Sequence, residues 1–130
     1  MSDGKVYNAD YFLRGKESGK SLYTDYRWMP ELTVPMVQRI TEHCGIEKGA
    51  RVLDFGCARG YVVRALIGLG YDAICVDVSE WAIRNADEVA KPYLNWCENS
   101  PPLLDREFDW IIAKDVLEHV EHVNQVIEYL

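Results

Sequence analysis

The stretch that decides the fold runs from Arg51 to Gly60 and reads Arg-Val-Leu-Asp-Phe-Gly-Cys-Ala-Arg-Gly. It begins as a short apolar strand over residues 51–55 and then breaks into a loop of small residues over 56–60. A run with helical spacing follows over residues 61–69. Strand, glycine loop and helix in this order are typical of a nucleotide-binding α/β unit, because the loop lets a ligand approach the main chain and the helix aims its first amides at that ligand. We therefore predict a ligand site here, and the alternative is a strand–turn–helix junction that binds nothing.

The spacing of the loop and its acidic neighbour indicate the kind of ligand. A dinucleotide site has the pattern Gly-x-Gly-x-x-Gly, with a pyrophosphate over the helix N-terminus. Here the small residues are Gly56, Ala58 and Gly60, and Asp54 precedes them at the end of the strand. A carboxylate at that point repels a pyrophosphate and suits a ligand that carries an ammonium group. A nicotinamide-binding oxidoreductase domain therefore remains only an alternative.

A second acidic residue, Asp77, ends the strand predicted over residues 73–78, roughly twenty residues after the glycine loop. Parallel neighbouring strands end at the same edge of a sheet, so this carboxylate can accept hydrogen bonds from both ribose hydroxyls of an adenosine. The alternative role, capping the helix predicted over residues 80–86, suits Ser79 better.

Three segments together resemble the class I S-adenosylmethionine-dependent methyltransferases. Residues 54–60 match the pattern Asp-x-Gly-x-x-x-Gly of the family's first motif, with Ala58 where glycine is common. Residues 76–83, Val-Asp-Val-Ser-Glu-Trp-Ala-Ile, resemble its second motif. Residues 108–120 begin with Phe-Asp and end with Leu-Glu-His-Val, which resembles its fourth motif. The resemblance covers about residues 50 to 120, the N-terminal half of the family's Rossmann-like domain.

The resemblance implies S-adenosylmethionine as cofactor, with S-adenosylhomocysteine as product. Asp54 would hold the loop and the ligand's amino group, Asp77 would bind the ribose, and a polar residue after the third strand would contact the adenine. His119 is a weak candidate for a catalytic base, and a structural histidine at a helix start is the default. No metal ligand set is expected. The implied cofactor-binding residues are Asp54, Gly56, Cys57, Ala58, Gly60, Asp77, Val78, Cys97, Glu98, Ala113 and Lys114.

We predict an α/β fold, a Rossmann-like three-layer sandwich with a parallel sheet. Four strands are visible, over residues 51–55, 73–78, 94–97 and 108–113, and the expected order is 3-2-1-4. The family fold has seven strands, so the sheet is expected to be truncated. The open edge of the fourth strand would need a partner chain, a second copy, the N-terminal arm or further sequence to cover it.

The residues before the sheet divide into an arm, 1–33, and the start of the Rossmann-like domain, 34–130. Thr33 is expected to cap a helix over residues 34–44, with Pro35 in its first turn. The arm is aromatic, and it either packs on the domain or forms a lid over the ligand. Its candidate ligand contacts are Tyr11, Phe12, Arg14, Arg27 and Trp28.

Composition limits the function classes. The chain has 130 residues and a net charge of −7 without a basic run, which argues against binding nucleic acid. No apolar stretch is long enough to cross a membrane, and no apolar signal core begins the sequence. The four cysteines form no Cys-x-x-Cys pair, so we expect reduced thiols and a cytoplasmic protein.

Two functions stand beside the nicotinamide-binding oxidoreductase, which Asp54 and the spacing of the loop argue against. The first is a methyltransferase that acts on an unidentified acceptor. The second is a cofactor-binding module, or one half of a split enzyme, without activity of its own. Cofactor binding without methyl transfer to any acceptor would favour the second.

Overall fold

The computed structural model describes residues 4–21, 26–97 and 107–130. Its centre is a four-stranded parallel sheet in the order β3-β2-β1-β4, as the sequence predicted. The strands are β1 (Arg51–Phe55), β2 (Asp72–Asp77), β3 (Leu94–Trp96) and β4 (Trp110–Ile112). β2 begins and ends one residue earlier than predicted. β3 is one residue shorter and β4 three residues shorter than the predicted strands.

The helices of the domain flank this sheet. They are α3 (Pro30–Cys44), α4 (Tyr61–Gly68), α5 (Glu80–Arg84) and α6 (Val123–Tyr129), with 3₁₀ turns η2 (Lys91–Tyr93) and η3 (Leu117–His119). The arm contains η1 (Gly4–Val6), α1 (Ala9–Phe12) and α2 (Gly15–Ser18). No helix among the described residues is both long enough and apolar enough to cross a membrane.

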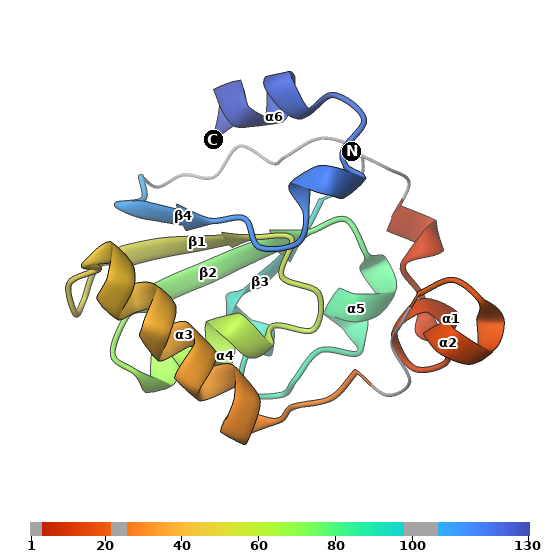
Figure 1. The fold of residues 1–130 in the computed structure, drawn as a ribbon, viewed down its shortest axis with the longest axis horizontal. Coiled ribbons are helices and arrows are strands. Elements are labelled where there is room, and N and C mark those ends of the chain that lie inside the picture. Colours follow the sequence, from red (N-terminus) through yellow and green to blue (C-terminus); the bar gives the residue numbers. More distant parts are fainter. Residues whose placement is uncertain (1–3, 22–25, 98–106) are drawn as a thin grey trace.

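Alternating side chains of the central strands fill two cores, one on each face of the sheet. Val52, Ala73 and Cys75 face α3 and α4, where Val37 and Leu66 are fully buried. Leu53, Phe55 and Val76 face the opposite layer, which includes Val126 of α6. Strands buried on both faces explain the continuous apolar runs in the sequence. Figure 1 shows α3 and α4 against one face of the sheet and α6 beyond β4.

The register of the sheet brings the two acidic strand ends together. Asp54 of β1 pairs with Cys75 of β2, and Phe55 pairs with Val76. At the other end of β1, the Asp109 carboxylate accepts a hydrogen bond from the Arg51 amide at 2.9 Å, which aligns β4 with β1. Because the strands are parallel and in this register, their carboxyl ends and the loops that follow them form one edge.

Several predicted boundaries were wrong. α3 begins at Pro30, with Met29 as its N-cap, rather than at residue 34, so Pro35 and Thr33 lie inside the helix. Pro30 at the first helical position needs no hydrogen-bonded amide and has a fixed φ, which makes it the better start. Cys44, in the last turn of this helix, is exposed. Val63 of α4 is fully buried.

The expectation of reduced thiols is also wrong for two cysteines. Cys57 of the glycine loop and Cys75 of β2 form a disulfide, with their Cα atoms 5.8 Å apart. The chain turns sharply after β1, so Cys57 returns over the neighbouring strand. Its amide donates to the Val76 carbonyl at 3.3 Å.

Candidate cofactor site

The glycine loop turns through three residues in the left-handed region of backbone conformation. The φ angles are 85° at Gly56, 51° at Ala58 and 84° at Gly60. Only glycine adopts this region without strain. Ala58 therefore differs from the glycine common in the resembling family by more than bulk, because its Cβ makes the loop conformation costly. Strained residues of this kind concentrate at ligand sites.

Space around the loop is equally restricted. A Cβ atom on Gly56 would lie 2.5 Å from Cγ2 of Val116, in the loop after β4. A Cβ on Gly60 would lie 2.8 Å from side-chain atoms of Ala90 and Leu94. Gly56 thus allows the loop after β4 to approach the loop after β1, and Gly60 allows α4 to begin close to β3.

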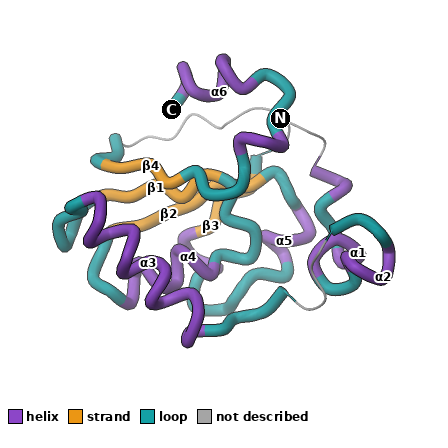
Figure 2. The backbone as a smooth tube through the Cα atoms, viewed as in Figure 1, coloured by secondary structure: helices purple, strands orange, loops and turns teal. Residues whose placement is uncertain are grey.

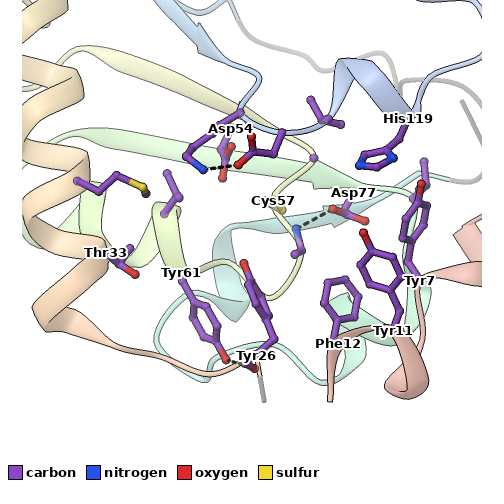
Figure 3. A pocket seen from close by; sticks show the side chains of 18 of the residues that line it. Tyr7, Tyr11, Phe12, Tyr26, Thr33, Asp54, Cys57, Tyr61, Asp77 and His119 are labelled. Atoms are coloured by element: carbon purple, nitrogen blue, oxygen red, sulfur yellow. Dashed lines mark hydrogen bonds and ion pairs between the residues drawn. The ribbon is translucent and has the colours of Figure 1, made fainter. Parts of the chain in front are cut away.

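Asp77 holds the glycine loop in place. Its Oδ2 accepts a hydrogen bond from the Ala58 amide at 2.7 Å (Figure 3). Its Oδ1 accepts one from the Ser79 amide at 2.7 Å. Burial raises the pKa of this carboxyl, while the bonds from backbone amides oppose that rise. Each carboxylate oxygen can accept more than one hydrogen bond, so capacity for ligand hydroxyls remains.

Asp54 is the buried group whose surroundings most clearly indicate a ligand site. It is 4% exposed and lines the cavity, and no hydrogen-bond donor among the described residues reaches its carboxylate. Its pKa is raised to about 7, first by burial and then by the nearby Asp77 charge, while the Lys114 charge acts in the opposite direction. A buried carboxylate without a partner is costly, and an ammonium group of a ligand would offset that cost.

Both carboxylates open into one cavity of about 330 Å³. Its walls come from the loops after β1, β2 and β4, from α3 and from the arm. Figure 3 shows Tyr7, Tyr11 and Phe12 of the arm on the Asp77 side and Thr33 of α3 on the opposite side. The cavity is in the size range of small-molecule sites. Of the residues predicted from sequence, it brings together Asp54, Gly56, Cys57, Ala58, Asp77, Val78, Lys114 and His119.

Other predicted residues lie outside the cavity wall. Gly60 packs beneath the loop, and Cys97, which is 4% exposed, lies in the core with a pKa that burial raises to about 11. Ala113 packs in the core on the α6 side of the sheet. Glu98 lies outside the described residues.

Of the candidate ligand contacts in the arm, some line the cavity and others do not. Tyr11, Phe12 and Arg27 line the cavity. Arg14 instead pairs with Asp10 at 2.7 Å, and Trp28 packs on the core beneath Arg64, whose guanidinium lies 4.4 Å from its ring.

His119 lies in the cavity wall, but it does not begin a helix. It ends η3, and α6 begins only at Val123. Its ring is 6.3 Å from that of Tyr7 in an edge-to-face arrangement, and its Nε2 is 3.6 Å from a carboxylate oxygen of Glu118. A histidine placed in this way can reach a ligand in the cavity.

Sequence analysis missed several wall residues. Tyr7, Tyr26 and Tyr61 belong to no motif. Met29 is the N-cap of α3, and Thr33 and Met36 lie within this helix. Asp115, with a φ of 55° and an ion pair to Lys114, also lines the cavity. The one available signal was the aromatic content of the arm.

Comparisons with known proteins agree with this geometry. A family model described as a methyltransferase domain matches residues 26–130. A ubiquinone biosynthesis O-methyltransferase of Rickettsia felis is 29% identical over 97 residues, which is 71% of this chain and 40% of that protein. The chain thus spans less than half the length of this relative.

Two solved structures share the fold. One, named as a methyltransferase of an antibiotic biosynthesis pathway from Anabaena variabilis, has a TM-score of 0.63 and 21% identity over 75% of this chain and 40% of that one. The other, a TehB-like SAM-dependent methyltransferase from Corynebacterium glutamicum, has a TM-score of 0.51 and 18% identity over 98% of this chain and 58% of that one. The family model matches most of the sequence, and the chain therefore belongs to the methyltransferase-domain family.

Proposed function

We propose that this chain binds S-adenosylmethionine in the cavity between Asp54 and Asp77 and contributes to methyl transfer. The observation that carries the proposal is the pair of buried carboxylates at the ends of β1 and β2, which open into one cavity beside the glycine loop. A cation with ribose hydroxyls complements both groups, whereas a pyrophosphate does not.

Each residue has a distinct part in this proposal. Asp54 pairs with the ammonium of the cofactor, and Asp77 accepts from the ribose hydroxyls while it keeps its bond to Ala58. Lys114, in the loop after β4, faces the methionine end. The backbone of Gly56, Cys57 and Ala58 supplies the shape of the loop, Gly60 lets α4 begin close to β3, and Val78 lines the cavity beside Asp77.

The cofactor supplies an activated methyl group, so the protein has to hold the acceptor in line with it. We propose a hydroxyl acceptor, which is supported by the O-methyltransferase names of the relatives. A hydroxyl must lose its proton, and His119 is the proposed base because it lines the same cavity. The alternative is a structural role, since His119 is exposed and its Nε2 lies 3.6 Å from a carboxylate oxygen of Glu118.

A second candidate is a cofactor-binding module that needs another segment or chain for activity. The outer edge of β4 has no strand partner among the described residues, and Val123 and Ile127 of α6 are 36% and 54% exposed. We propose that a second copy, another chain or further sequence covers this surface. The described arm residues do not cover it, because α1 and α2 lie beside α5 and Tyr7 packs near η3, away from the outer edge of β4 (Figures 1 and 2).

For the cellular location we propose the cytoplasm, as expected from the sequence. The Cys57–Cys75 disulfide argues in the other direction, because disulfides persist mainly in oxidising compartments. Cell fractionation with thiol labelling would decide between them.

Calorimetric titration of S-adenosylhomocysteine tests the proposed function directly. Asp77→Ala should weaken binding by about 1–3 kcal/mol, because charge-assisted hydrogen bonds to the ribose and the brace on Ala58 are both lost. Glu42→Ala, on the exposed side of α3, is the matched carboxylate control and should bind like the wild type. Equal affinities in the Asp77 variant and the wild type would contradict the assignment.

A further inference from the structure

The N-terminal arm is attached to the loop that follows Asp77. The Ser79 hydroxyl donates to the Tyr7 carbonyl and accepts from the Ala82 amide at 3.0 Å, so this helix cap also holds the arm. Gly4 packs against the main chain at the same place, because a Cβ there would lie 1.8 Å from the Val78 carbonyl oxygen. One end of the arm is therefore attached next to the proposed ribose site.

A second attachment joins the arm to the glycine loop through Arg59. Its Nη1 donates to the Tyr26 carbonyl at 2.9 Å, and its Nε donates to the Asn85 carbonyl at the end of α5 at 2.7 Å. The Tyr61 hydroxyl donates to the same Tyr26 carbonyl at 3.2 Å. The planar guanidinium thus joins two carbonyls from segments far apart in the sequence, an arrangement that the single ammonium of lysine does not reproduce.

Aromatic packing connects the two attachments. Phe12 is 5% exposed and stacks on Trp81 of α5 with ring centroids 5.7 Å apart, and its ring is 5.3 Å from that of Tyr26. The Arg59 guanidinium lies 5.7 Å from the Trp81 ring and 5.9 Å from the Tyr61 ring. The arm, α5 and the glycine loop therefore pack as one layer.

This layer forms a wall of the cofactor cavity. Tyr7, Tyr11, Phe12 and Tyr26 of the arm line the cavity together with Asp54 and Asp77. The Ala58 amide donates a hydrogen bond to the Asp77 carboxylate. Arg59, which holds the arm, is the next residue in the chain. Movement of either one affects the other through a single peptide unit.

We propose that Arg59 is a positioning residue that holds the arm closed across the cavity and couples arm closure to the cofactor-binding conformation of the glycine loop. This inference rests on the proposed function in one respect, that S-adenosylmethionine occupies this cavity. Arg59 does not line the cavity, so it acts through Tyr26 and through its own loop.

The test compares Arg59→Ala and Arg59→Lys with Arg84→Ala, a matched control on the exposed side of α5 where the arginine forms an ion pair with Glu80. Limited trypsin digestion without ligand measures arm opening through cleavage after Lys16 and Lys20. Stopped-flow dissociation of S-adenosylhomocysteine measures the coupling. Urea unfolding of each variant establishes that the domain is folded.

In Arg59→Ala, arm cleavage and cofactor dissociation should both become about ten-fold faster, the scale of one or two charged-group hydrogen bonds. Arg59→Lys, which keeps the charge but not the two-carbonyl geometry, should recover only part of each effect. Arg84→Ala should match the wild type in both. A folded Arg59→Ala protein with wild-type cleavage overturns the holding role, and faster cleavage with unchanged dissociation overturns the coupling.

The result can be separated from a failure of the proposed function. If folded wild-type protein does not bind S-adenosylhomocysteine, the proposed function and the coupling are both overturned. The digestion rates, which need no ligand, would still decide whether Arg59 holds the arm.

Discussion

Asp54 is the residue whose protonation links the site to pH. Its pKa is raised to about 7, first by burial, so between its usual value near 3.8 and that point the folded state binds a proton that the unfolded state has released. The free energy of unfolding of the ligand-free protein therefore falls as pH rises through this window. Binding of a cationic ligand has the opposite dependence, because it needs the ionised carboxylate.

We predict that the affinity for S-adenosylhomocysteine rises about ten-fold between pH 6 and pH 8 and levels off above, as expected for one group that releases a proton near pH 7. In Asp54→Asn the affinity should be lower and should not change across this range. Calorimetric titration at each pH measures both. Glu42→Gln serves as control, and a pH slope that persists in Asp54→Asn would show that another group titrates.

The other decisive residues act through the backbone. Ala58 was expected to change only the bulk of the loop, but its φ of 51° makes it a strained position. No sequence pattern reveals a positive φ angle at an alanine, because this conformation accompanies the tertiary hydrogen bond from the Ala58 amide to Asp77. The acidic residues, in contrast, could be predicted because each ends an apolar strand.

At the scale of the element, the glycine loop between β1 and α4 tests how backbone conformation supports the site. Gly56→Ala should lower the free energy of unfolding by about 1–3 kcal/mol, because the new Cβ would lie 2.5 Å from Val116 and the residue keeps a φ of 85°. Cofactor affinity should fall as well, because the loops after β1 and β4 would separate.

Ala58→Gly is the opposite change in the same loop. It removes the left-handed strain and should raise the free energy of unfolding by about 0.5–1 kcal/mol, after the entropy of the added glycine is counted. Urea unfolding measures both variants. A loss of stability in Ala58→Gly would mean that the alanine side chain stabilises the loop by packing.

Element boundaries followed the sequence best where strong local signals occur. β1 begins and ends where predicted, and Ser79 caps α5 as expected. α3 begins four residues before the predicted start because two prolines compete for its first turn. Val123, Val126, Ile127 and Leu130 have helical spacing in the sequence and lie in or next to α6. Of them only Val126 is buried, since burial depends on which elements pack against the helix.

At the scale of the whole molecule, β4 forms an open edge of the sheet. Trp110 of β4 is 38% exposed, and no described strand pairs beyond it. Exposed strand edges recruit other strands. We predict that the isolated chain self-associates with rising concentration, as light scattering after size-exclusion chromatography would show.

Trp110→Lys should shift this association toward monomer, because a charged side chain on an edge strand opposes pairing. Val89→Lys, on an exposed residue between α5 and η2 rather than on β4, is the control for added charge. A concentration-independent monomer in the wild type would indicate that this edge is protected without a partner.

Much of this protein was determined by its sequence. Apolar runs between helical segments specified a parallel sheet, and the motifs placed Asp54, Asp77 and the glycine loop at one edge of it, because parallel strands end on the same side. These features depend on neighbours in the chain and on the repeat of secondary structure, so local pattern suffices to predict them.

Only the tertiary structure decided how the site is enclosed. The contact of Gly4 with Val78, the bond from Arg59 to Tyr26 and the Cys57–Cys75 disulfide join residues 18 to 74 positions apart. Such contacts depend on how the arm returns across the finished sheet. No local propensity records that path, because hydrogen bonds to backbone carbonyls and stacking between aromatic rings leave no characteristic spacing in the sequence.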